Sequence, residues 1–223
     1  MRRIGFIHSG SHFQLACLND PAVVALDVVD CYAPELDAKD LEGLDALFVS
    51  ARLHPGVIPA IAPLVLDFLA GEGRRVYVDG ENSVGEWLPG TGEEPRGTNF
   101  WGWRVGEDVG RRSVNRTHPF WDRLSERSVH WHYHGVLTHP SAAVPLVRLE
   151  EIEDPPQSID PWGLPYRALP DHPNTLLYVD SATFVAEIVV STMDAAFHHG
   201  SGFMPGATQL FYRMLRWLGE PRS

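Results

Sequence analysis

Alternating histidines form the segment of this chain best suited to chemistry. His130, His132 and His134 are separated by Trp131 and Tyr133. In an extended strand, side chains two residues apart point to the same face, so this pattern predicts three imidazoles side by side. Neutral imidazoles bind divalent metals and exchange protons near neutral pH. We therefore take these three histidines as candidate ligands of a divalent metal such as zinc. The alternative is a partly exposed strand without a site.

A second pair of histidines, His198 and His199, lies near the C-terminus. It follows the apolar, β-branched run 186–193, so it is expected just beyond the end of a strand. We interpret His132 and His199 as candidate catalytic groups and His198 as a candidate substrate-binding group. Whether the two histidine clusters share a site depends on the order of the strands in the sheet.

The elements that must position these residues follow from the spacing of apolar side chains. Apolar residues at helical spacing predict helices over 59–70 and 207–218, and the first half of the chain alternates such patterns with short apolar runs. This alternation is typical of parallel βαβ units. We expect a single α/β domain over residues 1–223, a flavodoxin-like three-layer sandwich with a central mostly parallel sheet and later antiparallel additions. The predicted strands are 4–8, 23–29, 45–50, 75–79, 130–134, 145–149, 175–179 and 186–193.

Ligands of open parallel sheets bind beyond the carboxyl ends of the strands. Glu81 follows a predicted strand there and is a candidate general base or metal ligand, with an acid stabilised at a helix N-terminus as the alternative. Trp101 belongs to the aromatic run 99–105 and is either a stacking platform for a sugar or base or a core residue. The further candidate substrate-binding residues at strand ends are His8, Arg52, His54 and Asn82.

Three segments carry a resemblance to a known family. They are the strand–turn–helix signal at Val78-Asp79-Gly80-Glu81-Asn82-Ser83, the His-Pro segment Thr117-His118-Pro119-Phe120-Trp121-Asp122-Arg123-Leu124, and the strand 186–194 followed by the helix 210–218. Together they resemble the class I glutamine amidotransferase-like superfamily, and most closely its ThuA-like branch, which is named for trehalose utilisation. The resemblance covers most of the chain and implies a pocket for a small polar, sugar-derived molecule.

The chain departs from that family at its reactive position. A glutamine amidotransferase carries Cys at the sharp turn, where this chain has Glu81 or Asn82. Cys17 and Cys31 are far from the turn in sequence, and without a thiolate there is no thioester route to ammonia. We expect no glutaminase activity. The sequence leaves open whether the protein is an enzyme using His and Glu, a non-catalytic metabolite-binding or scaffold domain, or a structural homo-oligomer.

Composition narrows the classes of partner. The 223 residues carry a formal net charge of −11, which disfavours nucleic acid and anionic membranes. Two isolated cysteines indicate a reducing compartment, and we find neither a signal peptide nor an apolar run of membrane-spanning length. We expect a cytoplasmic protein that binds a small-molecule ligand and forms, at most, homo-oligomers.

Overall fold

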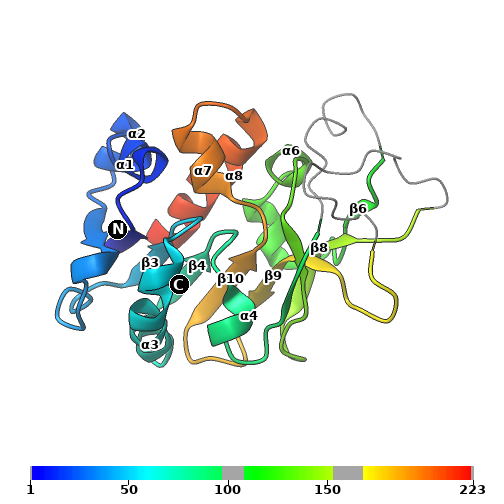
Figure 1. Ribbon diagram of the computed structural model, residues 1–223, viewed down its shortest axis with the longest axis horizontal. Coiled ribbons are helices and arrows are strands. Elements are labelled where there is room, and N and C mark those ends of the chain that lie inside the picture. The colour runs from blue at the N-terminus through cyan, green and yellow to red at the C-terminus, as the bar shows by residue number, and fades with distance from the viewer. Residues whose placement is uncertain (1, 97–107, 153–167, 222–223) are drawn as a thin grey trace.

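A single mixed sheet organises the computed structural model, which describes residues 2–96, 108–152 and 168–221 (Figure 1). Within these residues the sheet has ten strands, and five neighbouring strands are parallel. Their order, β2-β1-β3-β4-β10, is the 2-1-3-4-5 order of flavodoxin-like folds. The predicted α/β fold with a central, mostly parallel sheet is therefore confirmed. The five strands are β1 (Ile4–His8), β2 (Val29–Tyr32), β3 (Ala46–Val49), β4 (Arg75–Val78) and β10 (Glu187–Ser191).

An antiparallel extension continues the sheet beyond β10. Strand β9 pairs with β10 in antiparallel orientation and is followed by strands that pair only antiparallel. The backbone N–H of His134 donates to the carbonyl of Thr192, 3.3 Å away, so the histidine segment is joined to the end of β10. The extension comprises β5 (Glu93–Pro95), β6 (Arg111–Ser113), β7 (Gly135–Leu137), β8 (Val144–Leu149) and β9 (Thr175–Asp180).

Helices cover both faces of the parallel strands and enclose two apolar cores (Figure 1). The predicted apolar stripe of the C-terminal helix is fully buried against one face, because its residues recur at the 3.6-residue period. On that face lie α1 (His12–Leu18), α2 (Pro21–Val24), α6 (Glu126–Val129), α7 (Ala195–Gly200) and α8 (Pro205–Gly219). On the other lie α3 (Ile58–Leu69) and α4 (Val84–Trp87), and the 3₁₀ turns are η1 (Ala33–Glu35), η2 (Pro55–Val57) and η3 (Pro119–Arg123).

Two predicted strands are wrong. The run 23–29 is not a strand: Asp20 caps α2 by accepting from the N–H of Ala22, and Pro21 occupies the first helical turn. These start signals outweigh the β-branched valines that follow. Residues 130–134 do not form a strand either, although Trp131 and Tyr133 are fully buried. The aromatic run 99–105, including Trp101, lies outside the described residues.

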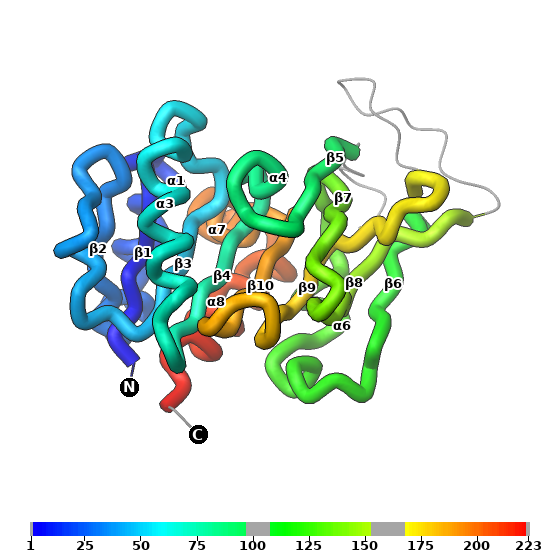
Figure 2. The backbone as a smooth tube through the Cα atoms, turned by 90° about the horizontal axis from the view of Figure 1, so that it is seen from below, coloured from blue at the N-terminus to red at the C-terminus, as the bar shows by residue number. Residues whose placement is uncertain are grey.

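The two ends of the described chain lie close together, as Figure 2 shows. The N–H of Arg2 donates to the carbonyl of Gly219, 3.3 Å away. This contact lies at the amino end of the parallel strands, so the opposite edge is left to the polar residues that follow them. In the described part of the chain, every helix is too short or too polar to cross a bilayer.

Candidate metal centre

The carboxyl ends of β3, β4 and β10 carry polar residues in a strained backbone. Arg52 and Glu81 have φ angles of 55° and 59°, in the left-handed region that non-glycine residues seldom adopt. A Cβ at Gly80 would lie 2.7 Å from backbone atoms of Thr192 and Met193, so glycine permits the close approach of β4 to β10. Strain of this kind is concentrated at functional sites.

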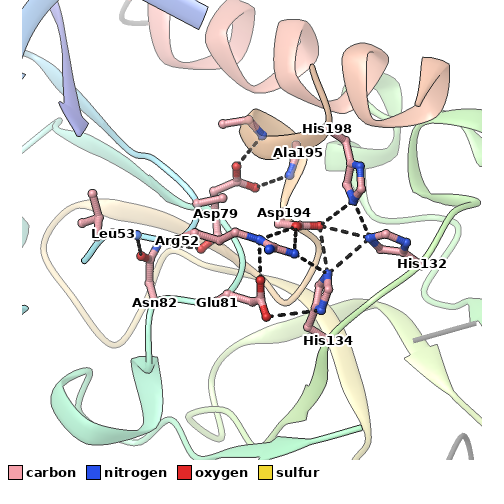
Figure 3. A network of polar contacts seen from close by, with 12 residues as sticks. Arg52, Leu53, Asp79, Glu81, Asn82, His132, His134, Asp194, Ala195 and His198 are labelled. Atoms are coloured by element: carbon pink, nitrogen blue, oxygen red, sulfur yellow. Dashed lines mark hydrogen bonds and ion pairs between the residues drawn. The ribbon is translucent and has the colours of Figure 1, made fainter. Parts of the chain in front are cut away.

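Four side chains converge at this edge. His132, His134, Asp194 and His198 each offer one ligand atom, and these atoms lie within 4.8 Å of one another. Asp194 Oδ1 is 3.2 Å from His134 Nε2 and 3.3 Å from the Nε2 atoms of His132 and His198 (Figure 3). Ligands of tetrahedral zinc at 2.0–2.1 Å lie about 3.3 Å apart, so these spacings fit that ion. The His132 and His198 Nε2 atoms, 2.5 Å apart, would separate on binding.

The charge state of the cluster suits a metal. Burial lowers the pKa of His132 to about 4, so this imidazole is neutral at pH 7. Although burial opposes ionisation of Asp194, the neighbouring histidines hold the pKa of its carboxyl well below the usual range. For His134, burial is outweighed by Asp194 and Glu81, which raise its pKa. A neutral imidazole and an ionised carboxylate are the forms that coordinate a divalent ion.

Outer partners orient the ligands (Figure 3). Glu81 Oε1 lies 3.3 Å from His134 Nδ1, which turns the Nε2 lone pair of this ring toward the cluster. The Arg52 guanidinium joins both carboxylates: its Nε is 2.5 Å from Glu81 Oε2, and its NH2 is 2.8 Å from Asp194 Oδ2. Asp194 Oδ1 is thereby left facing the three imidazoles. A carboxylate on a ligating histidine is a recurrent feature of protein metal sites.

Only two of the three alternating histidines join the cluster. His130 lies at the C-terminal end of α6, where its Nδ1 contacts the guanidinium of Arg111. The backbone is not extended through 130–134, so the period-2 argument fails for its first member. His199 also lies elsewhere: its Nε2 is 3.5 Å from Asp20 Oδ2, and its ring stacks on Phe211. The expected pairing of His132 with His199 is thus replaced by His132 with His198.

The other predicted site residues are spread along the same edge. His8 Nε2 lies 2.6 Å from Asp30 Oδ1, and His54 caps η2 by accepting from the N–H of Gly56. Asn82 is buried, where it accepts from the N–H of Leu53 and donates to backbone carbonyls. Asn82 therefore shapes the loop of Arg52 from within.

Asp194 was missing from the predicted ligands. It stands at the end of an apolar strand and four residues before His198, which places both side chains on one side of a helical start. That spacing is the signal that could have identified it.

Two clefts meet at Glu81. One has a volume of about 650 Å³, and His134 forms part of its wall. The other, about 550 Å³, follows β1, β3 and β4 and includes Arg52 and His54. Because the strand order reverses between β1 and β3, this is where such sheets bind ligands. The first cleft is lined by Glu81, Ser83, Gly85, Glu86, Gly92, Glu93, Glu94, Pro95 and His134.

Similar proteins were found only among solved structures. No family model and no curated protein sequence matches the chain. A GMP synthase subunit protein from Thermoplasma acidophilum has a TM-score of 0.55 at 9% identity, covering 97% of this chain and 94% of that one. The mmIFT52 N-terminal domain has a TM-score of 0.51 at 9% identity, covering 99% of each chain.

A third similar structure belongs to a longer protein. Alpha-L-fucosidase isoenzyme 2 from Paenibacillus thiaminolyticus has a TM-score of 0.51 at 11% identity, covering 99% of this chain but 33% of the fucosidase chain. At identities this low, all three likenesses show the α/β fold alone.

Proposed function

We propose that this chain is an amidotransferase-like, ThuA-like protein that binds a divalent metal such as zinc and acts on a small polar molecule. The observation that carries the proposal is the convergence of three Nε2 atoms on Asp194 Oδ1 at 3.2–3.3 Å. The metal would be held by His132, His134, Asp194 and His198. A buried set of lone pairs this close together is costly unless a cation lies among them.

A bound zinc ion would supply Lewis acidity and a water of lowered pKa. The residues around it supply the remaining functions. Glu81 borders both clefts, so it can accept a proton from a group that enters beside His134. Arg52 holds Glu81 and Asp194 in place, and one third of its side chain is exposed, so it can also contact a polar substrate.

The charge of the larger cleft indicates the class of substrate. Four glutamates line it, while Lys and Arg are lacking among the described lining residues. Burial raises the pKa of Glu93, and the nearby Glu81 and Glu86 raise it further. Such walls repel anions and accept hydrogen bonds from hydroxyl or amino groups. Sugar-derived polyols and amines are therefore the first compounds to test.

Glutaminase activity is not part of the proposal. Glu81 occupies the turn where the resembled family carries its cysteine. Cys17 and Cys31 are both buried, and burial raises the pKa of both thiols, that of Cys31 to about 11. Neither thiol provides the thiolate that attack on glutamine requires.

A second candidate function is a non-catalytic metal or metabolite site. Four protein ligands fill a tetrahedral shell, as in structural zinc sites, whereas catalytic zinc keeps a position open. Azide titrated into the Co²⁺-loaded protein separates the two candidates. A changed visible spectrum indicates an open position and supports the enzyme, while an unchanged spectrum supports the closed site.

Metal content tests the proposal directly. Protein purified without a polyhistidine tag is analysed for its elements, with His132→Ala as the test variant and His130→Ala as the matched control. We expect close to one metal ion per chain in the wild type and in His130→Ala, and little in His132→Ala. Metal-free wild type that also takes up no zinc on titration would overturn the proposal.

A further inference from the structure

Helix α7 begins without help from its own N-cap residue. Asp194 stands at the N-cap position, with φ −95° and ψ 68°, yet its side chain accepts no hydrogen bond from the helix. Aspartate at this position ordinarily accepts from the backbone N–H two or three residues on. Here its carboxylate faces Arg52 and the histidines instead. The first N–H groups of α7 therefore need another acceptor.

Asp79, which follows β4, provides that acceptor (Figure 3). Its Oδ1 accepts from the N–H of Ala195 at 2.9 Å, and its Oδ2 accepts from the N–H of Ala196 at 2.7 Å. The hydroxyl of Tyr77 also donates to Oδ1, at 2.9 Å. Asp79 is completely buried, so these bonds replace the water that a carboxylate would otherwise bind.

The turn after β4 holds Asp194 from both sides. The N–H of Gly80 donates to the carbonyl of Met193 at 3.0 Å, just before Asp194, and Asp79 holds the two residues just after it. Asp194 is thus fixed between two anchors on one neighbouring turn. The same anchors set the start of α7, and with it the position of His198 one helical turn later.

We infer that Asp79 is a positioning residue of the metal centre, which caps α7 from β4 and so leaves Asp194 free to act as a ligand. The inference rests on the proposed metal-binding function. For helix stability alone, the cap could come from Asp194 itself. With Asp79 as the cap, a carboxylate can face the imidazoles without leaving the helix start unpaired.

Asp79→Asn tests this inference, because the amide keeps the shape of the side chain but can accept at only one of its two ends. Asp180→Asn is the matched control. Asp180 is also buried, and its Oδ1 accepts from the N–H groups of Ala182 and Thr183, each at 2.9 Å, in a turn that holds none of the proposed ligands. Zinc affinity is measured by competition with a chromophoric chelator, and the Co²⁺ spectrum reports ligand geometry.

We expect zinc affinity to fall by about 10-fold or more in Asp79→Asn, the range seen when outer partners of metal ligands are removed. The Co²⁺ bands should weaken, and Asp180→Asn should match the wild type in both readouts. Measurements are made at a temperature where circular dichroism shows every variant folded. A merely structural role would lower the melting temperature without changing affinity or spectrum, and that result would overturn the inference.

Tyr77→Phe covers the case in which Asp79→Asn does not fold. It removes the hydroxyl that donates to Asp79 and keeps the buried ring. We expect a smaller loss of zinc affinity, and an unchanged affinity would then refute the positioning role. If the wild type itself binds no metal, the proposed function fails and the inference fails with it. Wild-type binding with an unaffected Asp79→Asn refutes the inference alone.

Discussion

Adjacent histidines on α7 allow a stringent test of the metal centre. His198 is buried with its Nε2 3.3 Å from Asp194 Oδ1, whereas His199 has its Nε2 3.5 Å from Asp20 Oδ2. We compare the thermal unfolding of the wild type, His198→Ala and His199→Ala, each with and without zinc. Both variants lose one imidazole from one short helix, so they differ mainly in whether a proposed ligand is lost.

The expected magnitude follows from binding linkage. At free zinc about 100 times the dissociation constant, binding to the folded state adds about 2.7 kcal/mol. A domain of this size gains about 2–4 °C in melting temperature per kcal/mol, so wild type and His199→Ala should gain about 5–11 °C. We assume that removing one of four ligands costs at least the upper end of an outer-partner loss, about 100-fold. His198→Ala then gains only about 0.4 kcal/mol from zinc, or about 1–2 °C.

The assay is differential scanning fluorimetry against a buffered series of free zinc concentrations, with EDTA as the reference for each variant. Comparing each variant with its own EDTA state removes the cost of the missing side chain. Equal zinc-induced shifts in all three proteins would refute the ligand assignment, and so would a shift lost in His199→Ala but kept in His198→Ala.

Three further predictions follow from single contacts. Glu81→Gln should weaken zinc binding about 10–100-fold in chelator competition, because an amide holds His134 Nδ1 less strongly than a carboxylate does; an unchanged affinity would remove Glu81 from the site. Gly80→Ala should lower the free energy of unfolding by about 1–3 kcal/mol in urea, since its Cβ would meet the backbone of Thr192 and Met193 at 2.7 Å; wild-type stability would contradict that contact. Burial, and then Asp30, raise the pKa of Cys31 to about 11, so iodoacetamide should label it at pH 8 only after unfolding. By the same shift, the stability associated with this thiol is present below its unfolded pKa of about 8.5 and is lost as pH rises toward 11, and fast labelling of native protein would show the thiol to be accessible.

The regular elements could largely be placed from the amino-acid sequence. Residues 4–8, 45–50 and 75–79 were predicted as strands, and the helix 207–218 was placed within two residues of α8. These predictions succeed because burial on one face imposes a period of 2 or 3.6 on the chain. The prediction failed at 23–29, where the β-branched composition was given more weight than the helix start signals at Asp20 and Pro21.

Which polar residues meet depends on the packing of elements that are distant in sequence. His198 and His199 are neighbours in sequence, but successive helical residues point about 100° apart, so the docking of α7 brings one toward Asp194 and the other toward Asp20. Asp194 meets Arg52 and Glu81 because β10, late in the chain, lies beside β4 in the sheet. Sequence spacing carries local periodicity, whereas the order of strands depends on contacts between residues far apart in the chain, and those contacts form the candidate site.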